Sequence, residues 1–267
     1  MVVPYAAAPN KIRILCLHGG GVNSSIFASQ TAPLLAAMKQ VVDVEFVYLD
    51  APYRSRRPYP GIERFWTGPF FSWWKRWQRP AMVEVVFAIE YVLRQARADG
   101  PFDGIMGFSQ GAALVAEILS CQDKHLLPHE RFKFGVLMCG SLAVLDNFPS
   151  NWRDSVFSGN TRSVVDAGTR AFAAQAGRVG EPPKDIPFQP EPIDIHTVHI
   201  TIPTAHIVGI ADPVRDRSEK LFAACPAGAW LQYTTLGHEV PQTTEETLAI
   251  RSAIMQACDA SRFSVAA

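Results

Sequence analysis

Gly107-Phe108-Ser109-Gln110-Gly111 is the stretch of this 267-residue chain that decides its fold. The run before it, Asp103–Gly107, predicts a strand, and Gln110–Ser120, rich in Ala, Leu and Val, predicts a helix. A serine in a tight strand-to-helix turn adopts strained backbone angles, and small neighbours let the turn pack. Such a turn lifts the serine Oγ above the sheet beside a helix N-terminus, which favours negative charge. We interpret Ser109 as a nucleophile; an incidental serine in a glycine-rich turn is the alternative.

Strands and helices alternate along the rest of the chain, which predicts a mostly parallel sheet with helices on both faces. Further strands are expected at Ile12–Leu17, Val44–Leu49, Phe134–Cys139, His206–Gly209 and Trp230–Thr234, and further helices at Met82–Ala98, Val214–Ala224 and Thr243–Ala257. The length fits a single domain over residues 1–267. Residues 53–79 and 150–197 interrupt the alternation, and we expect both to be excursions above the active site.

A candidate acid and a candidate base follow the serine in the order Ser, acid, His that the α/β-hydrolase fold uses. Asp212 follows the run Ile207–Ala211, which continues the predicted strand His206–Gly209, and helix capping is its alternative role. His238 lies in a loop between the last predicted strand and helix, from which its ring can reach Ser109. Asp216, inside a predicted helix, and Asp194, in an irregular stretch, are weaker candidates for the acid.

These three residue types make a serine hydroxyl reactive when they act together. His238 would accept the proton of Ser109 and later donate it to the leaving group. Asp212 would hold the tautomer of the ring and stabilise its charged form. The set predicts acyl transfer through an acyl-enzyme.

The glycine loop His18-Gly19-Gly20-Gly21 follows the first predicted strand, where this fold supplies an oxyanion donor. We assign the donors as the N–H of Gln110 and the N–H of Gly20 or Gly21, since glycines let the backbone approach a substrate oxygen. His18 is expected to orient this loop. A phosphate-binding loop is the rival interpretation, but the chain has neither GxxxxGK[ST] nor GxGxxG at this point.

Residues 53–79 are both aromatic and basic. They contain four of the six tryptophans and seven Lys or Arg against one acid, Glu63, in a chain of zero formal net charge. We expect a cap whose aromatic side chains bind the acyl substrate, namely Phe65, Trp66, Phe70, Phe71 and Trp73. Its arginines would face an anionic partner, such as an acidic acyl carrier protein or the phosphates of coenzyme A. A packed loop with a solvated basic face is the other interpretation.

Several classes of protein lack support in the sequence. A neutral chain without a general basic surface argues against nucleic acid, and no apolar run approaches the length of a membrane span. No cofactor motif is present. His196 and His199 permit a metal site only weakly, because no Cys or carboxylate accompanies them, so no metal is expected. Five cysteines without a framework and an N-terminal segment unlike a signal peptide predict a cytoplasmic protein.

With these residues assigned, the chain resembles the FSH family of serine hydrolases, which is common in fungi. The matching segments are Arg13–Gly19, the following Asn23 with Ile26-Phe27, the turn Gly107–Gly111 and the late Gly237-His238. The resemblance implies a compact α/β-hydrolase with Ser109, Asp212 and His238 as its triad. The stretch from Pro60 to Trp73 is similar to a subgroup found beside fungal polyketide synthases, which implies release of an acyl chain from a carrier protein.

Three functions therefore remain open. The first is a thioesterase that acts on acyl groups carried by a protein or by coenzyme A. The second is a general carboxylesterase for small esters, with the same residues and an open pocket. The third is a non-hydrolytic cyclase or binding role on the same fold. The intact set of Ser109, Asp212 and His238 argues against it, since a pure binding module has no physical need for all three.

Overall fold

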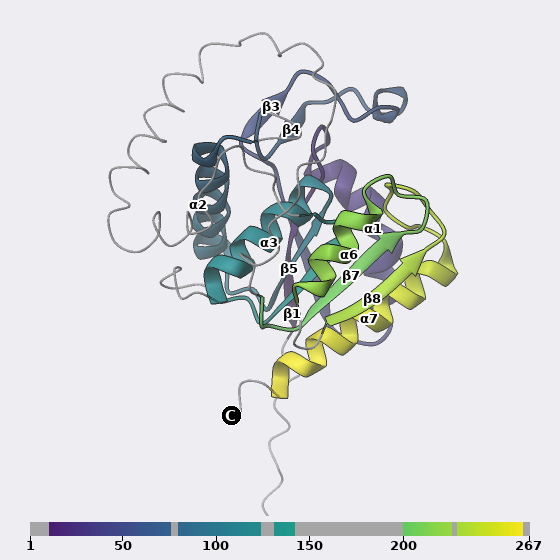
Figure 1. Cartoon of the computed structure of the whole chain (residues 1–267). Coiled ribbons are helices and arrows are strands. Elements are labelled where there is room, and N and C mark those ends of the chain that lie inside the picture. The colour runs from purple at the N-terminus through teal and green to yellow at the C-terminus, as the bar shows by residue number, and fades with distance from the viewer. Residues whose placement is uncertain (1–10, 76–79, 124–130, 142–199, 226–228, 264–267) are drawn as a thin grey trace, which may run out of the picture.

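Short, nearly continuous apolar runs form the central sheet of the protein. The structure, a computed structural model, describes residues 11–75, 80–123, 131–141, 200–225 and 229–263. Within these residues the strands of the main sheet are β1 (Ile12–Leu17), β2 (Val44–Leu49), β5 (Gly104–Phe108), β6 (Phe134–Met138), β7 (Thr204–Gly209) and β8 (Ala229–Thr234). The sheet is parallel throughout, in the order β2-β1-β5-β6-β7-β8 (Figure 1).

Helices cover both faces of this sheet, and the side chains of β1 show how the faces are divided. The helices are α1 (Ser24–Lys39), α2 (Met82–Asp99), α3 (Gln110–Asp123), α6 (Arg215–Ala223) and α7 (Thr244–Phe263). Ile14 and Cys16 pack into the apolar cluster that contains residues of α1 and α7. Leu15 and Leu17 pack into the opposite cluster, with residues of α2, α3 and α6. Successive strand residues point to opposite faces, so both faces of β1 are buried.

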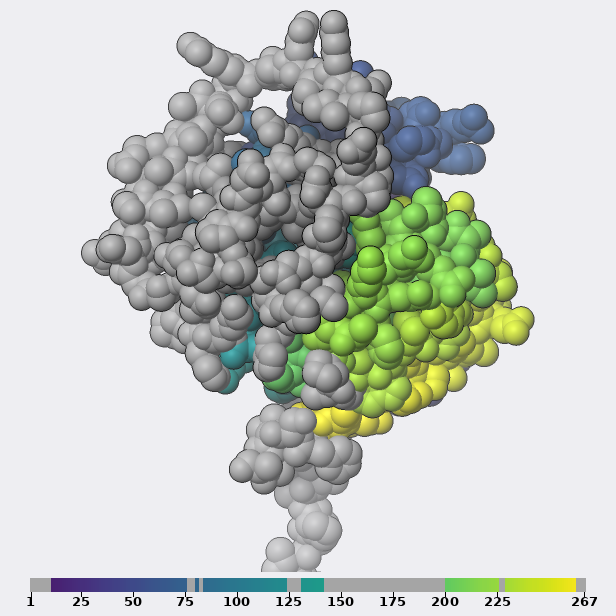
Figure 2. Space-filling view, in the orientation of Figure 1, coloured from purple at the N-terminus to yellow at the C-terminus, as the bar shows by residue number. Residues whose placement is uncertain are grey.

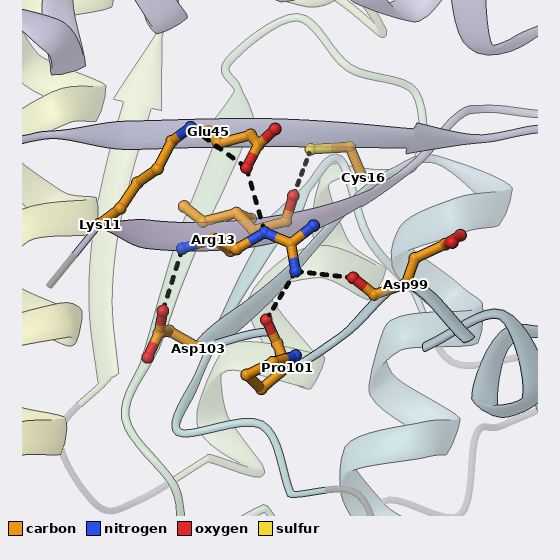
Figure 3. A network of polar contacts seen from close by, with 8 residues as sticks. Lys11, Arg13, Cys16, Glu45, Asp99, Pro101 and Asp103 are labelled. Atoms are coloured by element: carbon orange, nitrogen blue, oxygen red, sulfur yellow. Dashed lines mark hydrogen bonds and ion pairs between the residues drawn. The ribbon is translucent and has the colours of Figure 1, made fainter. Parts of the chain in front are cut away.

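A polar network fixes the amino edge of the sheet, at the end away from the carboxyl ends of the strands. Arg13 of β1 donates from Nε to Glu45 of β2 over 3.0 Å and from Nη1 to the carbonyl oxygens of Asp99 and Pro101 (Figure 3). The backbone N–H of Arg13 donates to the Asp103 carboxylate over 3.0 Å. One side chain thus connects two strands with the loop between α2 and β5.

A small antiparallel hairpin lies above the carboxyl edge of the main sheet (Figure 1). It pairs β3 (Tyr53–Ser55) with β4 (Phe70–Ser72), and the loop between them contains the short 3₁₀ helix η1 (Ile62–Arg64). This hairpin is the described part of the predicted excursion 53–79. Residues 76–79 of that excursion lie outside the described residues, as does the whole of 150–197.

The predicted fold class, a mostly parallel sheet with helices on both faces, is confirmed. The first two strands have the expected bounds, and the others differ by one or two residues at their ends. The last helix extends to Phe263, six residues beyond the predicted end. Helix α1 and the β3–β4 hairpin were not predicted. Among the described residues, no helix combines the length and the apolar character that a membrane span requires.

Candidate active site

The turn between β5 and α3 holds Ser109 in a left-handed backbone conformation. Its φ is 53°, and its N–H donates to the Met138 carbonyl of β6 over 2.9 Å. Both glycines of the turn are sterically required: a Cβ on Gly107 would overlap the backbone of Gly111, and a Cβ on Gly111 would overlap the Leu17 carbonyl of β1. A non-glycine residue at positive φ is strained, so packing around the turn must maintain it.

A continuous chain of hydrogen bonds joins the three predicted catalytic residues. Ser109 Oγ lies 2.7 Å from His238 Nε2, and His238 Nδ1 lies 2.8 Å from Asp212 Oδ2. The other carboxylate oxygen of Asp212 accepts the N–H of Val214 over 2.8 Å. With Nδ1–H donating to the carboxylate, Nε2 is left to accept the serine proton. The structure thus brings together residues that are 129 positions apart in the chain.

The carboxylate of Asp212 is buried, with none of its side chain exposed to solvent. Burial acts to raise the pKa of this carboxyl group, but hydrogen bonds from His238 and from the Val214 N–H outweigh it and hold the pKa below its usual value. The acid therefore stays ionised near neutral pH, as a group that stabilises an imidazolium must.

Two aromatic rings enclose the His238 imidazole. The Phe108 ring lies 5.3 Å from it, centroid to centroid, and the Tyr59 ring lies 6.3 Å away in a stacked arrangement. The loop that carries His238 also packs closely on the end of β7, where a Cβ on Gly209 would overlap the backbone of Gly237. These contacts orient the base without using its nitrogen atoms.

The two candidate glycine donors of the oxyanion loop differ in their surroundings. The Gly21 N–H donates to the Phe71 carbonyl of β4 over 2.8 Å and lies 3.2 Å from Ser72 Oγ. Since that N–H is already bonded, Gly21 is not free to bind an oxyanion in this structure, and Gly20 as the donor stays a prediction. Gln110 is the first residue of α3, where an N–H has no partner within the helix.

His18 fixes the shape of the oxyanion loop from below. Its Nε2 accepts the Ala51 N–H over 3.0 Å, so its Nδ1 carries the hydrogen and donates to the Gly19 carbonyl over 2.6 Å. Burial lowers the pKa of His18 to about 4, although the bond to Gly19 and the charge of Asp50 act in the opposite direction. His18 is therefore a neutral structural group and not a second base.

The hairpin is tied to this loop and to the nucleophile turn by main-chain bonds. Phe71 N–H donates to the Val22 carbonyl over 2.7 Å, and Tyr59 N–H donates to the Gly21 carbonyl over 2.9 Å. The Gln110 side chain accepts the N–H of Trp73 over 2.8 Å. Residues 53–75 therefore form part of the structure around the serine and are more than a solvated loop.

The five aromatic residues predicted to bind substrate occupy three different environments. Trp73 is fully buried, and its indole N–H donates to the His18 carbonyl over 2.8 Å, so its expected place in the substrate-binding surface is corrected to a support beneath the loop. Phe70 and Phe71 are half-buried on β4. Phe65 and Trp66 are 84% and 37% exposed, next to η1. Part of this segment, in blue, projects from the body of the molecule in Figure 2.

One cluster of possible metal ligands occurs among the described residues, and it overlaps the catalytic group. It consists of Cys139, Asp212 and His238, whose ligand atoms lie within 4.8 Å of one another. His238 already bonds both Asp212 and Ser109, which is an arrangement for proton transfer. His196, His199 and Asp194 lie outside the described residues.

Sequence reasoning did not identify two neighbours of the base. Tyr59 stacks on His238 from the hairpin, and Cys139 follows β6 directly, between the strands that lead to Ser109 and to Asp212. The order of the strands, which a single sequence does not give, would have identified Cys139. Tyr59 lies in the segment that was predicted as a cap, but it was not selected there.

A parallel sheet with a strained serine turn, a histidine within hydrogen-bonding distance and a buried carboxylate defines a serine hydrolase of the α/β-hydrolase class. The profile of the family described as "Serine hydrolase (FSH1)" matches residues 7–250 of the chain. The chain belongs to this family, which confirms the resemblance drawn from its motifs.

Curated fungal relatives agree with this assignment, and a solved structure agrees with the fold. The chain is 29% identical to "Esterase FUS5" of Gibberella fujikuroi over 91% of its own length and 85% of that protein. It is 30% identical to "Esterase FPY3" of Fusarium mangiferae over 89% and 92%. The crystal structure of Arabidopsis thaliana SOBER1 matches with a TM-score of 0.51 and 18% identity, covering 92% of this chain and 99% of that one, which supports the fold alone.

Proposed function

We propose that the protein hydrolyses acyl thioesters through an acyl-enzyme on Ser109 and so releases a polyketide-type acyl chain from a carrier protein. The observation that carries the hydrolytic part is the hydrogen-bond chain from Ser109 Oγ through His238 to Asp212, with distances of 2.7 Å and 2.8 Å. The carrier part is supported by the basic hairpin beside the site and by the similarity to enzymes found beside polyketide synthases.

The first half-reaction forms the acyl-enzyme. His238 Nε2 takes the proton of Ser109 Oγ as this oxygen attacks the acyl carbonyl, and the charge that develops on histidine faces the Asp212 carboxylate. The N–H groups of Gln110 and Gly20 bind the oxyanion, at a helix N-terminus that favours negative charge. When the tetrahedral intermediate collapses, the bond to the thiolate leaving group breaks and His238 returns the proton to sulfur.

The second half-reaction repeats these steps with water. His238 removes a proton from a water molecule, whose oxygen attacks the acyl carbonyl, and the proton then returns to Ser109 as the free acid leaves. No metal or cofactor takes part in these steps. The free enzyme is regenerated with Ser109 protonated and hydrogen-bonded to His238.

The exposed part of the hairpin supports a protein-bound substrate. Arg54, Arg56, Arg57 and Arg64 are exposed, with Glu63 as the acid among them. Phe65 and Trp66 lie beside Arg64 and offer apolar surface at the same place. A basic surface with exposed aromatic side chains suits an acidic partner such as an acyl carrier protein, since opposite potentials speed encounter.

The nucleophile is tested by incubating the wild type and Ser109→Ala with a fluorophosphonate probe and measuring intact mass. We expect one adduct on the wild type and none on the variant. Labelling of Ser109→Ala would mean that another residue is the nucleophile. Product formation that persists in Ser109→Ala without hydrolysis would favour a cyclase or binding role.

The leaving group is tested with one acyl chain presented on three carriers: an acidic acyl carrier protein, coenzyme A and a simple alcohol. We expect the highest kcat/KM for the carrier-protein thioester, with a loss of at least about tenfold when Arg56, Arg57 and Arg64 are changed together to Glu. The coenzyme A thioester reports whether phosphate charge alone suffices. Turnover of the oxyester alone would favour the carboxylesterase function, which fits the description of the fungal relatives as esterases.

A cytoplasmic location is part of this proposal. All five cysteines, which lie in the described residues, are buried free thiols. Free thiols are typical of a reducing compartment, where acyl carrier proteins and coenzyme A also act. Localisation of the tagged full-length chain by microscopy tests this point, and secretion into the medium would contradict it.

A further inference from the structure

Cys139 lies between the strand that leads to Ser109 and the strand that leads to Asp212. It directly follows β6, which lies between β5, leading to Ser109, and β7, leading to Asp212. Its N–H donates to the Ile207 carbonyl of β7 over 2.8 Å, while the carbonyl of the preceding Met138 accepts the N–H of Ser109 over 2.9 Å. The end of β6 therefore connects the nucleophile turn to the strand that positions the acid.

The backbone of Cys139 is strained in the same way as that of the nucleophile. Its φ is 48°, and in the described part of the chain Ser109, at 53°, is the other non-glycine residue with positive φ. A side chain in this conformation is unfavourable, and glycine would adopt it without that cost. Gly140 is the next residue, yet cysteine occupies the strained position. Strained residues of this kind gather at functional sites.

The thiol of Cys139 lies beside the catalytic acid and is protected from solvent. The residue is 3% exposed, and its Sγ, an Asp212 carboxylate oxygen and a His238 ring nitrogen all lie within 4.8 Å of one another. Burial raises the pKa of the Cys139 thiol well above its usual value, and the charge of Asp212 and a hydrogen bond to it raise it further. The sulfur therefore keeps its hydrogen and acts as a donor.

The buried Asp212 carboxylate has room for such a donor. Its two oxygens accept one hydrogen bond each, from Val214 N–H and from His238 Nδ1. A carboxylate offers about four acceptor positions, and one without solvent contact depends on protein donors. Tyr59 and Glu239 are other titratable groups near this cluster: burial raises the pKa of Tyr59, and the charges of Asp212 and Glu239 act in the same direction.

We propose that Cys139 is a positioning residue whose thiol donates a hydrogen bond to the Asp212 carboxylate and holds it in line with the His238 ring. The residue does not touch the substrate. It acts through Asp212, so it affects the charged transition state more than the binding of the acyl group. This inference rests on the proposed roles of Ser109, Asp212 and His238.

The test compares Cys139→Ala, Cys139→Ser and Cys139→Gly with the matched variant Cys225→Ala. Cys225 is a second buried thiol, 2% exposed, that donates to the Leu221 carbonyl of α6 instead of to the catalytic group. We expect Cys139→Ala to lower kcat about tenfold with little change in KM, because a hydrogen bond to a charged group is lost. Cys139→Ser, which keeps a donor, should recover most of that activity.

Cys139→Gly separates strain from hydrogen bonding. Glycine accepts the positive φ, so this variant is expected to fold, yet without the thiol its kcat should fall as in Cys139→Ala. The low-field proton resonance of the His238–Asp212 hydrogen bond should shift in Ala and Gly variants and stay unchanged in Cys225→Ala. A kcat per folded molecule equal to that of the wild type in Cys139→Gly, with an unshifted resonance, would overturn the proposal.

Ser109→Ala, assayed in parallel, distinguishes the failure of this proposal from the failure of the triad. Full activity of Ser109→Ala would reject the catalytic group itself. Loss of activity in Ser109→Ala together with wild-type kcat in all three Cys139 variants would reject only the positioning role.

Discussion

Gln110 Oε1 accepts a hydrogen bond from the backbone N–H of Trp73 over 2.8 Å, so the residue after the nucleophile also anchors the hairpin. The Nε2 atom of the same side chain faces the carbonyl of Trp74 at 3.5 Å. One residue thus supplies a proposed oxyanion donor from its backbone and fixes the segment above the site with its side chain. The hairpin and the nucleophile turn are therefore expected to respond together to mutation.

Gln110→Ala keeps the backbone N–H but removes the anchor of the hairpin. We expect kcat/KM to fall about tenfold, because the lost bonds cost about 1–2 kcal/mol and the oxyanion loop loses support through the hairpin. Gln122→Ala is the matched control, since the Gln122 side chain donates to the Phe132 carbonyl and accepts the Phe132 N–H at the other end of α3. Steady-state kinetics corrected for the folded fraction should show the loss in Gln110→Ala and not in Gln122→Ala.

Asp212→Asn should lower kcat by about three to four powers of ten. An amide can present its NH₂ group to His238 and favour the tautomer with Nδ1 unprotonated, which leaves Nε2 unable to accept the proton of Ser109. Asp216→Asn serves as the control, because this acid lies in the first turn of α6. Burst and steady-state assays on an activated ester measure both variants. A larger loss in Asp216→Asn would contradict the assignment of the acid.

Substitution of Trp73 should lower the stability of the protein, whereas substitution of Trp66 should leave it nearly unchanged. Trp73→Phe removes the bond to the His18 carbonyl and leaves space in a fully buried site, so we expect the free energy of unfolding to fall by about 2 kcal/mol. Trp66→Ala, at a residue that is 37% exposed, should leave stability within about 0.5 kcal/mol.

Urea denaturation measures this stability difference, and kinetics on a carrier-bound substrate measure the effect on binding. Trp66→Ala should raise the KM for that substrate and leave the KM for a small ester unchanged. An equal loss of stability in both variants would contradict the distinction between support and exposed surface.

Stability should decrease in mild acid because two buried histidines stay neutral in the folded state. Burial lowers the pKa of His18 to about 4 and that of His206 to about 3, from an ordinary value of 6.5. Above pH 6.5 the His18 and His206 rings are neutral in both the folded and the unfolded chain, so these residues do not lower the free energy of unfolding. As the pH falls below that value, the unfolded chain binds protons that the folded chain excludes, so stability is lost.

Each histidine should contribute up to about 1.4 kcal/mol per pH unit between pH 6 and pH 4.5. Urea midpoints at pH 7.5, 6 and 5 give the slope of the free energy of unfolding against pH. His206→Gln should reduce this slope by the contribution of one histidine. His206 is the simpler of the two to change, because it bonds Thr204 and contacts the Phe222 ring away from the catalytic group. A slope that is the same in wild type and variant would contradict this account.

Local sequence patterns were sufficient to predict the strands of the sheet and to select Ser109, Asp212 and His238, which the structure brings together. Buried parallel strands such as Ile12–Leu17 are continuous apolar runs, and Ser109 lies in a turn whose glycines are visible in the sequence. Helix α1 was not predicted because its apolar pattern is weak and Pro33 lies inside it. Its start is set by Asn23, whose side chain accepts the N–H of Ile26.

The environments of the aromatic residues could not be predicted because they depend on distant backbone groups. Trp73 and Trp66 are neighbours in an aromatic segment, but one is buried against the carbonyl of His18 and the other faces solvent. The three-residue strand β4 is likewise fixed by bonds from Phe71 to Gly21 and Val22, about fifty positions earlier. The position of Cys139 between Ser109 and Asp212 could not be predicted either, because it depends on the order of the strands in the sheet.

The separation of Ser109 and His238 by 129 residues has a consequence for how activity appears during folding. The strand before Ser109, the strand before Asp212 and the strand before His238 are joined by parallel pairings, which form between segments far apart in the chain and are slow to assemble. A growing chain that ends before β8 has the nucleophile but lacks the base. In refolding experiments, esterase activity should therefore return last, after helical signal and compaction, and should report completed assembly of the sheet.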